Sequence, residues 1–263
     1  MSLNDPDQGT WSYQYSLFND LTQQEDALGQ RTEMTYDALG RMLNRVDKKA
    51  GGTVIEGNTS WVYDSASNGL GKVSTVTDSA SGYVMAYDYD DLGRIHQTYT
   101  SLGTNGSEGN FSQLVTYDQI GRVFQEIDAT NHGVQYFYNS HGYMEKIAEA
   151  TDTTKVYKRI ESANAWGNET QSMLGNGLKV QSTYHATMGL PDRVLVTNPS
   201  TQTIQDNSYD YNDIGILTNR SRFVKSNNST LSETFHYDEL NRLTQATATG
   251  LPTQSFQYDI KGN

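Results

Sequence analysis

The sequence has no cysteine. This absence excludes disulfide bonds and zinc sites built on thiolates. Apolar residues are also scarce, at 35% of 263 residues, and no apolar run approaches the roughly 20 residues that a membrane-spanning helix requires. The first residues, Met-Ser-Leu-Asn-Asp-Pro, lack the basic and apolar regions of a signal peptide. We therefore expect no targeting signal in this chain and no membrane insertion by this segment.

Positive charge is the next shortage. Lysine and arginine together number 19, against 31 aspartate and glutamate residues, so the formal net charge is -12. Nucleic acids and anionic membranes attract basic patches. The charge balance therefore argues against a nucleic-acid partner.

Signatures of catalysis and cofactor binding are missing too. The sequence has no Gly-x-Ser-x-Gly, no His-Glu-x-x-His and no phosphate-binding glycine loop. The histidines never pair at metal-ligand spacing; they are His96, His132, His141, His185 and His236. We therefore predict no catalytic residue, no cofactor, no metal site and no enzymatic activity.

One phrase is present in many copies. "TYDALGRMLNRV" starts at Thr35, and close copies follow as "DYDDLGRIHQTY", "TYDQIGRVFQEI" and "HYDELNRLTQAT". The shared part is Tyr-Asp-x-x-Gly-Arg, with asparagine for glycine in the last copy. We predict a structural role for this repeat motif, whose residues are Tyr36, Asp37, Gly40, Arg41, Tyr89, Asp90, Gly93, Arg94, Tyr117, Asp118, Gly121, Arg122, Tyr237, Asp238, Asn241 and Arg242.

Weaker copies make the repeat regular. They place the glycine at Gly71, Gly142, Gly189, Gly215 and Gly262, and Gly167 in "NAWGN" is a decayed copy. Nine steps separate Gly40 from Gly262, so the period is about 25 residues, within the range of repeat arrays. Two strands of about 7 to 9 residues and their turns account for this period.

Each copy predicts a β-hairpin. Aspartate and glycine take the first and fourth positions of a type I turn, where aspartate accepts backbone N–H groups and glycine adopts positive φ. Apolar residues alternate with polar ones on both sides of the turn, which is the period of a strand. We therefore predict an all-β fold of consecutive antiparallel hairpins, a long sheet that curls or spirals into a partial shell or a barrel-like strip.

Domain boundaries are not visible in the sequence. We expect residues 1–25 to be a lead-in, a strand that joins the array, and residues 26–263 to be one array of about ten hairpins. The copies are degenerate around residues 157–192, where we expect the sheet to bend or to be interrupted. The last residues, "KGN", stop inside a turn motif, which predicts a truncated array.

The Tyr-Asp-x-x-Gly-Arg phrase at this spacing resembles the YD repeat of the Rhs family, which includes Rhs polymorphic toxins, cocoon-forming subunits of Tc toxins, and teneurins. The resemblance covers nearly the whole chain, as a stretch of the repeat array only. It implies a sheet that spirals into a hollow shell, which in the bacterial members encloses a toxic C-terminal polypeptide. The family's Asp-Pro-x-Gly-Leu segment is absent, because the single Asp-Pro is Asp5-Pro6 and lacks the leucine.

The resemblance implies a structural wall segment that encapsulates or scaffolds a polypeptide cargo such as a C-terminal toxin. The implied partners are this cargo or neighbouring parts of the same parent protein, and the implied location is the secreted space or cell surface of a bacterium. An open array leaves unpaired strand edges, so we also expect self-association.

Three alternatives stay open from the residues. The aromatic-rich sheet could bind carbohydrate or a surface receptor, with Trp61 and Trp166 as the first glycan contacts. The aspartates of the turns could serve catalysis or calcium binding rather than the turns themselves. The basic residues after the glycines could bind an anion, although pairing with the turn carboxylates is the interpretation we favour.

Overall fold

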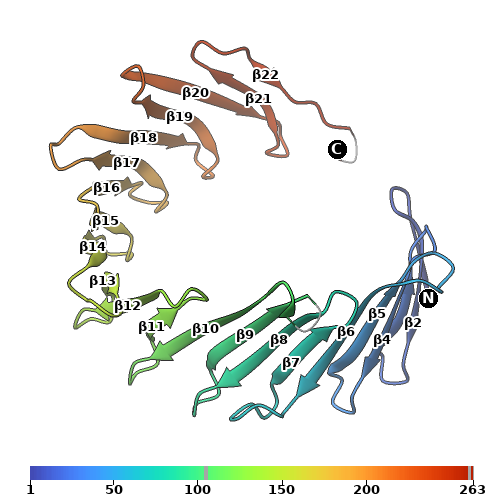
Figure 1. The fold of residues 1–263 in the computed structure, drawn as a ribbon. Coiled ribbons are helices and arrows are strands. Elements are labelled where there is room, and N and C mark those ends of the chain that lie inside the picture. Colours follow the sequence, from blue (N-terminus) through green and yellow to red (C-terminus); the bar gives the residue numbers. More distant parts are fainter. Residues whose placement is uncertain (104–105, 260–261, 263) are drawn as a thin grey trace. The chain divides into compact units, whose positions relative to one another are not determined.

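The structure is a computed structural model that describes residues 1–103, 106–259 and 262. It comprises two compact units, Met1–Gly133 and Val134–Asn263 (Figure 1). Each unit is described by itself.

The first unit is an antiparallel meander, in which each strand pairs with the next one along the chain. Its strands are β1 (Ser2–Asp5), β2 (Gly9–Tyr15), β3 (Leu21–Glu25), β4 (Arg31–Tyr36), β5 (Met42–Lys48), β6 (Ile55–Tyr63), β7 (Val73–Asp78), β8 (Tyr83–Tyr89), β9 (Ile95–Leu102), β10 (Gly109–Tyr117) and β11 (Val123–Ile127).

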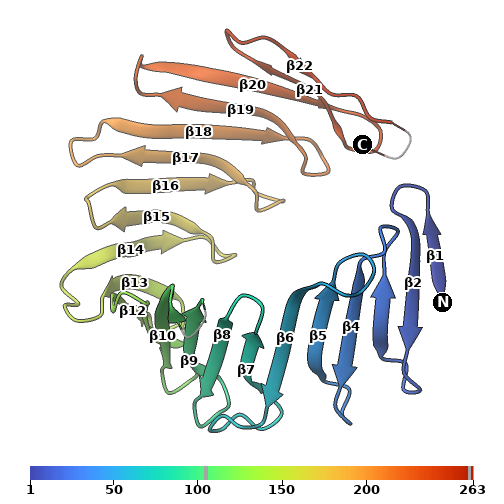
Figure 2. The same ribbon diagram turned by 45° about the vertical axis from the view of Figure 1, so that its right-hand side comes forward.

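The second unit repeats this arrangement (Figure 2). Its strands are β12 (Gly133–Tyr138), β13 (Met144–Glu149), β14 (Val156–Ala163), β15 (Glu169–Leu174), β16 (Lys179–Tyr184), β17 (Pro191–Thr197), β18 (Thr203–Tyr211), β19 (Leu217–Val224), β20 (Ser229–Tyr237), β21 (Leu243–Ala248) and β22 (Gln254–Ser255).

The predicted fold class is confirmed. Every strand pair is antiparallel, and the residues that the structure describes contain no α-helix. Among those same residues, no helix has the length and apolar character needed to cross a bilayer. The periodicity of two read from the sequence thus identified the architecture.

The two segments that the sequence set apart, residues 1–25 and residues 157–192, both consist of paired strands. Residues 1–25, expected to be a lead-in strand, hold β1, β2 and β3. The degenerate stretch 157–192 continues the meander without a break in pairing, because β14 pairs with β15, β15 with β16 and β16 with β17. The departure from the consensus appears instead as two register shifts between β14 and β15, at Ile160/Ser162 and at Ser162/Ala163.

Each unit has almost no core. The buried apolar residues of the described chain are Met34, Ala148 and Val196, and most other strand residues are half-buried. Cross-strand polar pairs fill the sheet faces: Thr32 donates to Asp47 across 2.7 Å, and Arg220 forms two bonds to Glu233 at 2.7 and 2.9 Å. Such pairs each contribute roughly 0.2–1 kcal/mol. Stability therefore depends on contacts between neighbouring strands rather than on a second layer.

Successive turns of a meander alternate between its two edges, so every second turn lies on the same edge. We call the YD edge the one that carries the turns between β2 and β3, β4 and β5, β6 and β7, β8 and β9, and β10 and β11, with their counterparts from β12/β13 to β20/β21 in the second unit. All the glycines that defined the sequence period lie in turns of this edge or, for Gly262, after the last strand.

The turns of the close copies of the motif share one backbone conformation. Gly40, Gly93 and Gly121 have φ of 76°, 71° and 89°, and Asn241 has φ of 62°. The ladder shifts register at the motif tyrosine, for example between Thr35 and Tyr36. A type I turn followed by a left-handed residue and a β-bulge is a common hairpin connection, and it explains why asparagine replaces glycine at position 241.

Candidate functional site

The aspartate of the motif holds its own turn together. Oδ1 of Asp37 accepts hydrogen bonds from the backbone N–H groups of Leu39 and Arg41, both at 2.9 Å. The N–H of Gly40 donates to the carbonyl of Asp37 at 3.1 Å. A single carboxylate oxygen therefore satisfies two of the donors that the turn would leave unpaired.

The other close copies repeat these bonds. Asp90 accepts from Leu92 and Arg94 at 3.0 and 2.8 Å, Asp118 from Ile120 and Arg122 at 3.0 and 2.9 Å, and Asp238 from Leu240 and Arg242 at 2.9 and 2.9 Å. Asn212 does the same with Ile214 and Ile216 at 3.2 and 2.9 Å. The amide suffices for the turn, so the turn alone does not require a charge.

The negative charge of the motif aspartate pairs with the arginine of the same motif. Nε of Arg41 donates to Oδ2 of Asp37 at 2.7 Å, and the same contact recurs from Arg94 to Asp90 at 2.7 Å. It recurs again from Arg122 to Asp118 at 2.7 Å and from Arg242 to Asp238 at 2.8 Å. Each guanidinium is thereby fixed against its own turn, in the carboxylate pairing that we favoured from the sequence.

The fixed guanidinium reaches the next hairpin. Arg41 lies 4.4 Å from the ring centroid of Tyr63, and its terminal nitrogens donate to the carboxylate of Asp64 at 3.1 and 2.8 Å. Arg94 lies 3.9 Å from the ring of Tyr117, and Arg242 lies 4.5 Å from that of Tyr258. A cation over an aromatic face contributes roughly 0.5–1 kcal/mol at exposed sites.

The tyrosine hydroxyl connects the hairpins in the other direction. The hydroxyl of Tyr36 donates to the carbonyl of Leu21, the first residue of the return strand in the preceding hairpin, at 2.8 Å. The bond recurs from Tyr63 to Met42 (2.9 Å), Tyr89 to Val73 (2.6 Å), Tyr117 to Ile95 (2.9 Å), Tyr184 to Glu169 (2.9 Å), Tyr211 to Pro191 (3.1 Å), Tyr237 to Leu217 (2.7 Å) and Tyr258 to Leu243 (2.8 Å).

The glycine is also part of this contact. A Cβ atom on Gly121 would lie 3.0 Å from Nη1 of Arg94, the arginine of the preceding copy. A Cβ atom on Gly93 would lie 3.1 Å from Cε of Lys72, which holds the arginine position there. Glycine therefore serves both the positive φ of its own turn and the close approach of the neighbouring turn.

The motif is thus a connector between hairpins. From the sequence we assigned the aspartate and glycine to the turn and the arginine to the aspartate, but we assigned no particular contact to the tyrosine. The hydroxyl contact was missed. A signal was present, because the aromatic residue at this position is tyrosine and never phenylalanine in Tyr36, Tyr63, Tyr89, Tyr117, Tyr138, Tyr184, Tyr211, Tyr237 and Tyr258.

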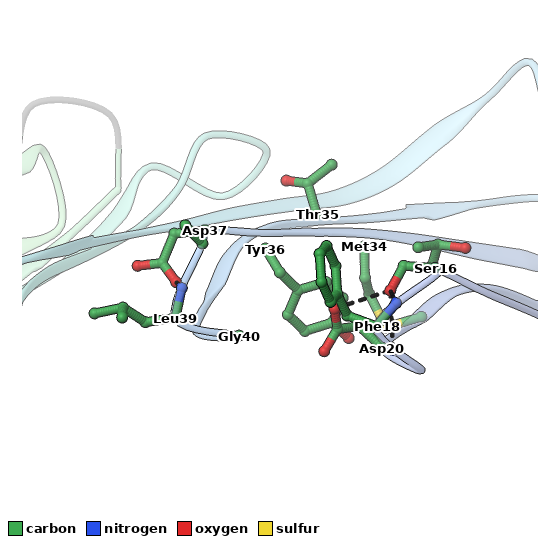
Figure 3. A pocket seen from close by; sticks show the side chains of 11 residues that line it. Ser16, Phe18, Asp20, Met34, Thr35, Tyr36, Asp37, Leu39 and Gly40 are labelled. Carbon is green, nitrogen blue, oxygen red and sulfur yellow. Dashed lines mark hydrogen bonds between the residues drawn. The ribbon is translucent and has the colours of Figure 1, made fainter.

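One further copy escaped the sequence analysis. The turn of "YSLFND" between β2 and β3 has Ser16 in place of aspartate, whose Oγ accepts from the N–H groups of Phe18 and Asp20, both at 3.1 Å. Asn19 takes the glycine position with φ of 69°. A pocket of about 720 Å³ lies between this turn and the Asp37 turn, lined by Phe18 and Leu39 among others (Figure 3).

The predicted glycan contacts lie in different units. Trp61 is half-buried in β6, and the side chain of Trp166 is 56% exposed in the turn between β14 and β15. A Cβ atom on Gly189 would lie 2.6 Å from the ring of Trp166, so this ring rests on the next turn. Carbohydrate contacts by these two residues stay a prediction. Within the described chain, no three histidine, aspartate or glutamate side chains gather as metal ligands would.

Comparison with a family model and with solved structures shows which known proteins the chain resembles. Residues 15–54 match the family model described as RHS Repeat. The fold of the chain matches the crystal structure of TcdB2-TccC3 without its hypervariable C-terminal region, with a TM-score of 0.81 at 16% identity, over 98% of this chain and 14% of that one.

Two more solved structures are similar in fold. The crystal structure of TcdB2-TccC3-Cdc42 matches with a TM-score of 0.79 at 15% identity, over 94% of this chain and 13% of that one. The Photorhabdus luminescens Tc holotoxin pore with the TccC3-D651A mutation matches with a TM-score of 0.77 at 16% identity, over 93% and 13%. No curated protein matches the chain significantly.

The resemblance to the YD/Rhs-repeat family is therefore supported in two ways: residues 15–54 match the repeat's model, and nearly the whole chain shares the fold of the TcdB2-TccC3 structures. The chain spans about a seventh of the length of the solved chains it matches.

We expect Tyr89→Phe to destabilise the protein by about 0.5–1.5 kcal/mol in urea unfolding, because it removes the hydroxyl bond to Val73 and keeps the ring. Tyr15→Phe is the matched control. Tyr15 holds the same motif position, and within the described chain its hydroxyl makes no hydrogen bond. An equal loss of stability in both variants would contradict a connecting role for the hydroxyl.

We also expect stability to fall in acid. The backbone N–H of Arg41 lowers the pKa of the Asp37 carboxyl, and the guanidinium of Arg94 lowers that of Asp90. The contribution of a carboxyl with a lowered pKa is fully present above the unfolded value, about 3.9, and is lost as pH falls through the folded value. Melting temperature should therefore drop as pH falls below about 4.

Replacing these carboxylates by amides tests the assignment. In Asp37→Asn/Asp90→Asn the turns persist, as at Asn212, while the titrating groups are gone. The variant should be less stable at pH 7 and should lose less stability between pH 5 and pH 3 than the unmodified chain. An unchanged slope would show that other carboxyls govern the acid transition.

Proposed function

We propose that the chain is a wall segment of a longer YD/Rhs-repeat protein and that the wall encloses or scaffolds a polypeptide. The observation that carries this proposal is the series of contacts between successive hairpins, made by tyrosine hydroxyls along the array and by Arg41, Arg94 and Arg242 in close copies of the motif. Such contacts suit an array whose role is to form an extended surface. They leave the turn carboxylates and guanidinium groups engaged with one another rather than with a substrate.

A polypeptide cargo fits the surface that the strip offers. The strands mix half-buried aromatic residues with threonine, asparagine and glutamine, so the strip can contact an unfolded segment without binding it tightly. A wall of paired strands also presents few open backbone groups to a protease. Similarity of fold to the TcdB2-TccC3 structures supports this assignment.

The same reasoning favours a scaffold over an enzyme. The motif aspartates accept backbone and arginine hydrogen bonds within their turns, which explains their spacing without any chemistry. By analogy with the fold's relatives, we infer that the parent protein is bacterial and secreted. Its cargo and the neighbouring parts of its own chain are then its partners.

Limited proteolysis of the parent protein, with and without residues 26–263, tests encapsulation. The C-terminal cargo should be cleaved at least about ten times faster once the array is deleted, because burial of the cleavage sites is lost. A parent protein that carries Leu28→Gln in an exposed turn serves as the control and should remain as resistant as the original. Equal resistance of the cargo with and without the array would refute encapsulation.

A further inference from the structure

One hairpin of the second unit lacks the tyrosine that joins the others. Its first strand, β14, ends at Ala163, which pairs with Glu169 at the start of β15. In the close copy at the start of the chain, Tyr36 ends β4 and pairs with Met42 at the start of β5. In both hairpins the ladder shifts register directly before this last residue. Ala163 therefore holds the place of the motif tyrosine and offers only a methyl group there.

The turn after Ala163 is otherwise an ordinary turn of the motif. Asn164 accepts two backbone hydrogen bonds within its turn, both at 3.0 Å, and Gly167 has φ of 83°. The next hairpin keeps its connection, because the hydroxyl of Tyr184 donates to the carbonyl of Glu169 at 2.9 Å. The missing ring thus leaves both the turn and the following connection intact.

A pocket of about 430 Å³ has the same neighbours as the motif tyrosine has elsewhere. It is lined by Ala163 itself and by Met144, the first residue of the preceding return strand, β13. Tyr143 stands at the arginine position of the preceding turn and forms another wall. A Cβ atom on Gly167 would lie 3.9 Å from the ring of Tyr143, so this ring reaches the next turn as the arginines do. The volume is within the range of small-molecule sites.

An acceptor for a hydroxyl group is already in place in this pocket. In the other hairpins, the tyrosine hydroxyl donates to the carbonyl of the first residue of the preceding return strand, as from Tyr36 to Leu21 at 2.8 Å. Met144 is that residue here, and no side chain of the described residues donates to its carbonyl. A ligand with a hydroxyl donor would therefore be favoured over a purely apolar one, because an acceptor covered without a partner costs free energy.

We propose that this pocket binds a neutral phenol, whose ring takes the place of the missing tyrosine and whose hydroxyl donates to the carbonyl of Met144. The array itself is the precedent, since its other copies fill this place with tyrosine and never with phenylalanine. A cavity that lacks a side chain can take up a small ring from solution. Glu145 and Glu161 line the same pocket, so it disfavours phenols that carry a negative charge.

The free side chain of tyrosine, p-cresol, is the direct probe. It is titrated into the ¹⁵N-labelled chain while the amide resonances are followed. We expect saturable shifts confined to residues 143–145 and 163–167, with a Kd of about 1 mM, as is usual for a ligand of this size. Toluene, which lacks the hydroxyl, and the anion 4-hydroxyphenylacetate should each bind at least about three times more weakly.

Filling the pocket from within the chain tests the same site. Ala163→Tyr should abolish binding of p-cresol and raise the melting temperature, because its ring and hydroxyl complete the contacts of the other hairpins. Ala80→Tyr, in an exposed turn of the first unit, is the matched control and should leave binding unchanged. Tyr143→Ala should weaken binding while circular dichroism shows an intact sheet, because one wall of the pocket is lost.

A phenol could reach this site as a small molecule or as a tyrosine of another polypeptide. Tighter binding of the peptide Gly-Tyr-Gly than of p-cresol would identify a polypeptide ligand, and the reverse order a small one. Equal binding of toluene and p-cresol would overturn the proposal, because the hydroxyl would then have no role. Shifts that do not saturate, or that persist in Ala163→Tyr, would also overturn it. The site is independent of any enclosed cargo.

Discussion

The contact of each tyrosine with the hairpin before it is the interaction on which the rest of the structure depends. A single-layer sheet cannot rely on a buried core, and only Met34, Ala148 and Val196 are buried apolar residues in the described chain. Backbone ladders alone would leave each hairpin free to twist against the next. The hydroxyl bond to a carbonyl fixes that junction along the array, and at Arg41, Arg94 and Arg242 the guanidinium over the ring reinforces it.

The four motif residues depend on one another, both within a turn and between successive turns. The aspartate closes the turn and orients the arginine, the arginine covers the tyrosine of the following hairpin, and the glycine leaves room for the arginine to do so. This explains why four residue types recur together. Each is needed by a neighbour in the array as well as by its own turn, so a change in one residue affects two hairpins.

Much of this architecture could be predicted from the sequence. The alternation of apolar and polar residues gave the strands, and the spacing of Asp37 and Gly40 gave the turn type, because both follow from local rules. The hydroxyl bond of Tyr36 and the stacking of Arg41 on Tyr63 could not be derived in the same way, since they join residues 15 and 22 positions apart. The copy at Tyr15 was missed because serine and asparagine replace the aspartate and glycine, although both pairs perform the same backbone tasks.

A double-mutant cycle on Arg94 and Tyr117, which belong to successive hairpins, tests the connector most directly. Unfolding in urea is measured for Arg94→Ala, Tyr117→Leu and the double variant, with Arg45→Ala and Tyr117→Leu as a control pair from strands that are not neighbours. The predicted result is a coupling of about 0.5–1 kcal/mol between Arg94 and Tyr117 and none in the control pair. Additive effects of Arg94→Ala and Tyr117→Leu would contradict the view that the motif joins one hairpin to the next.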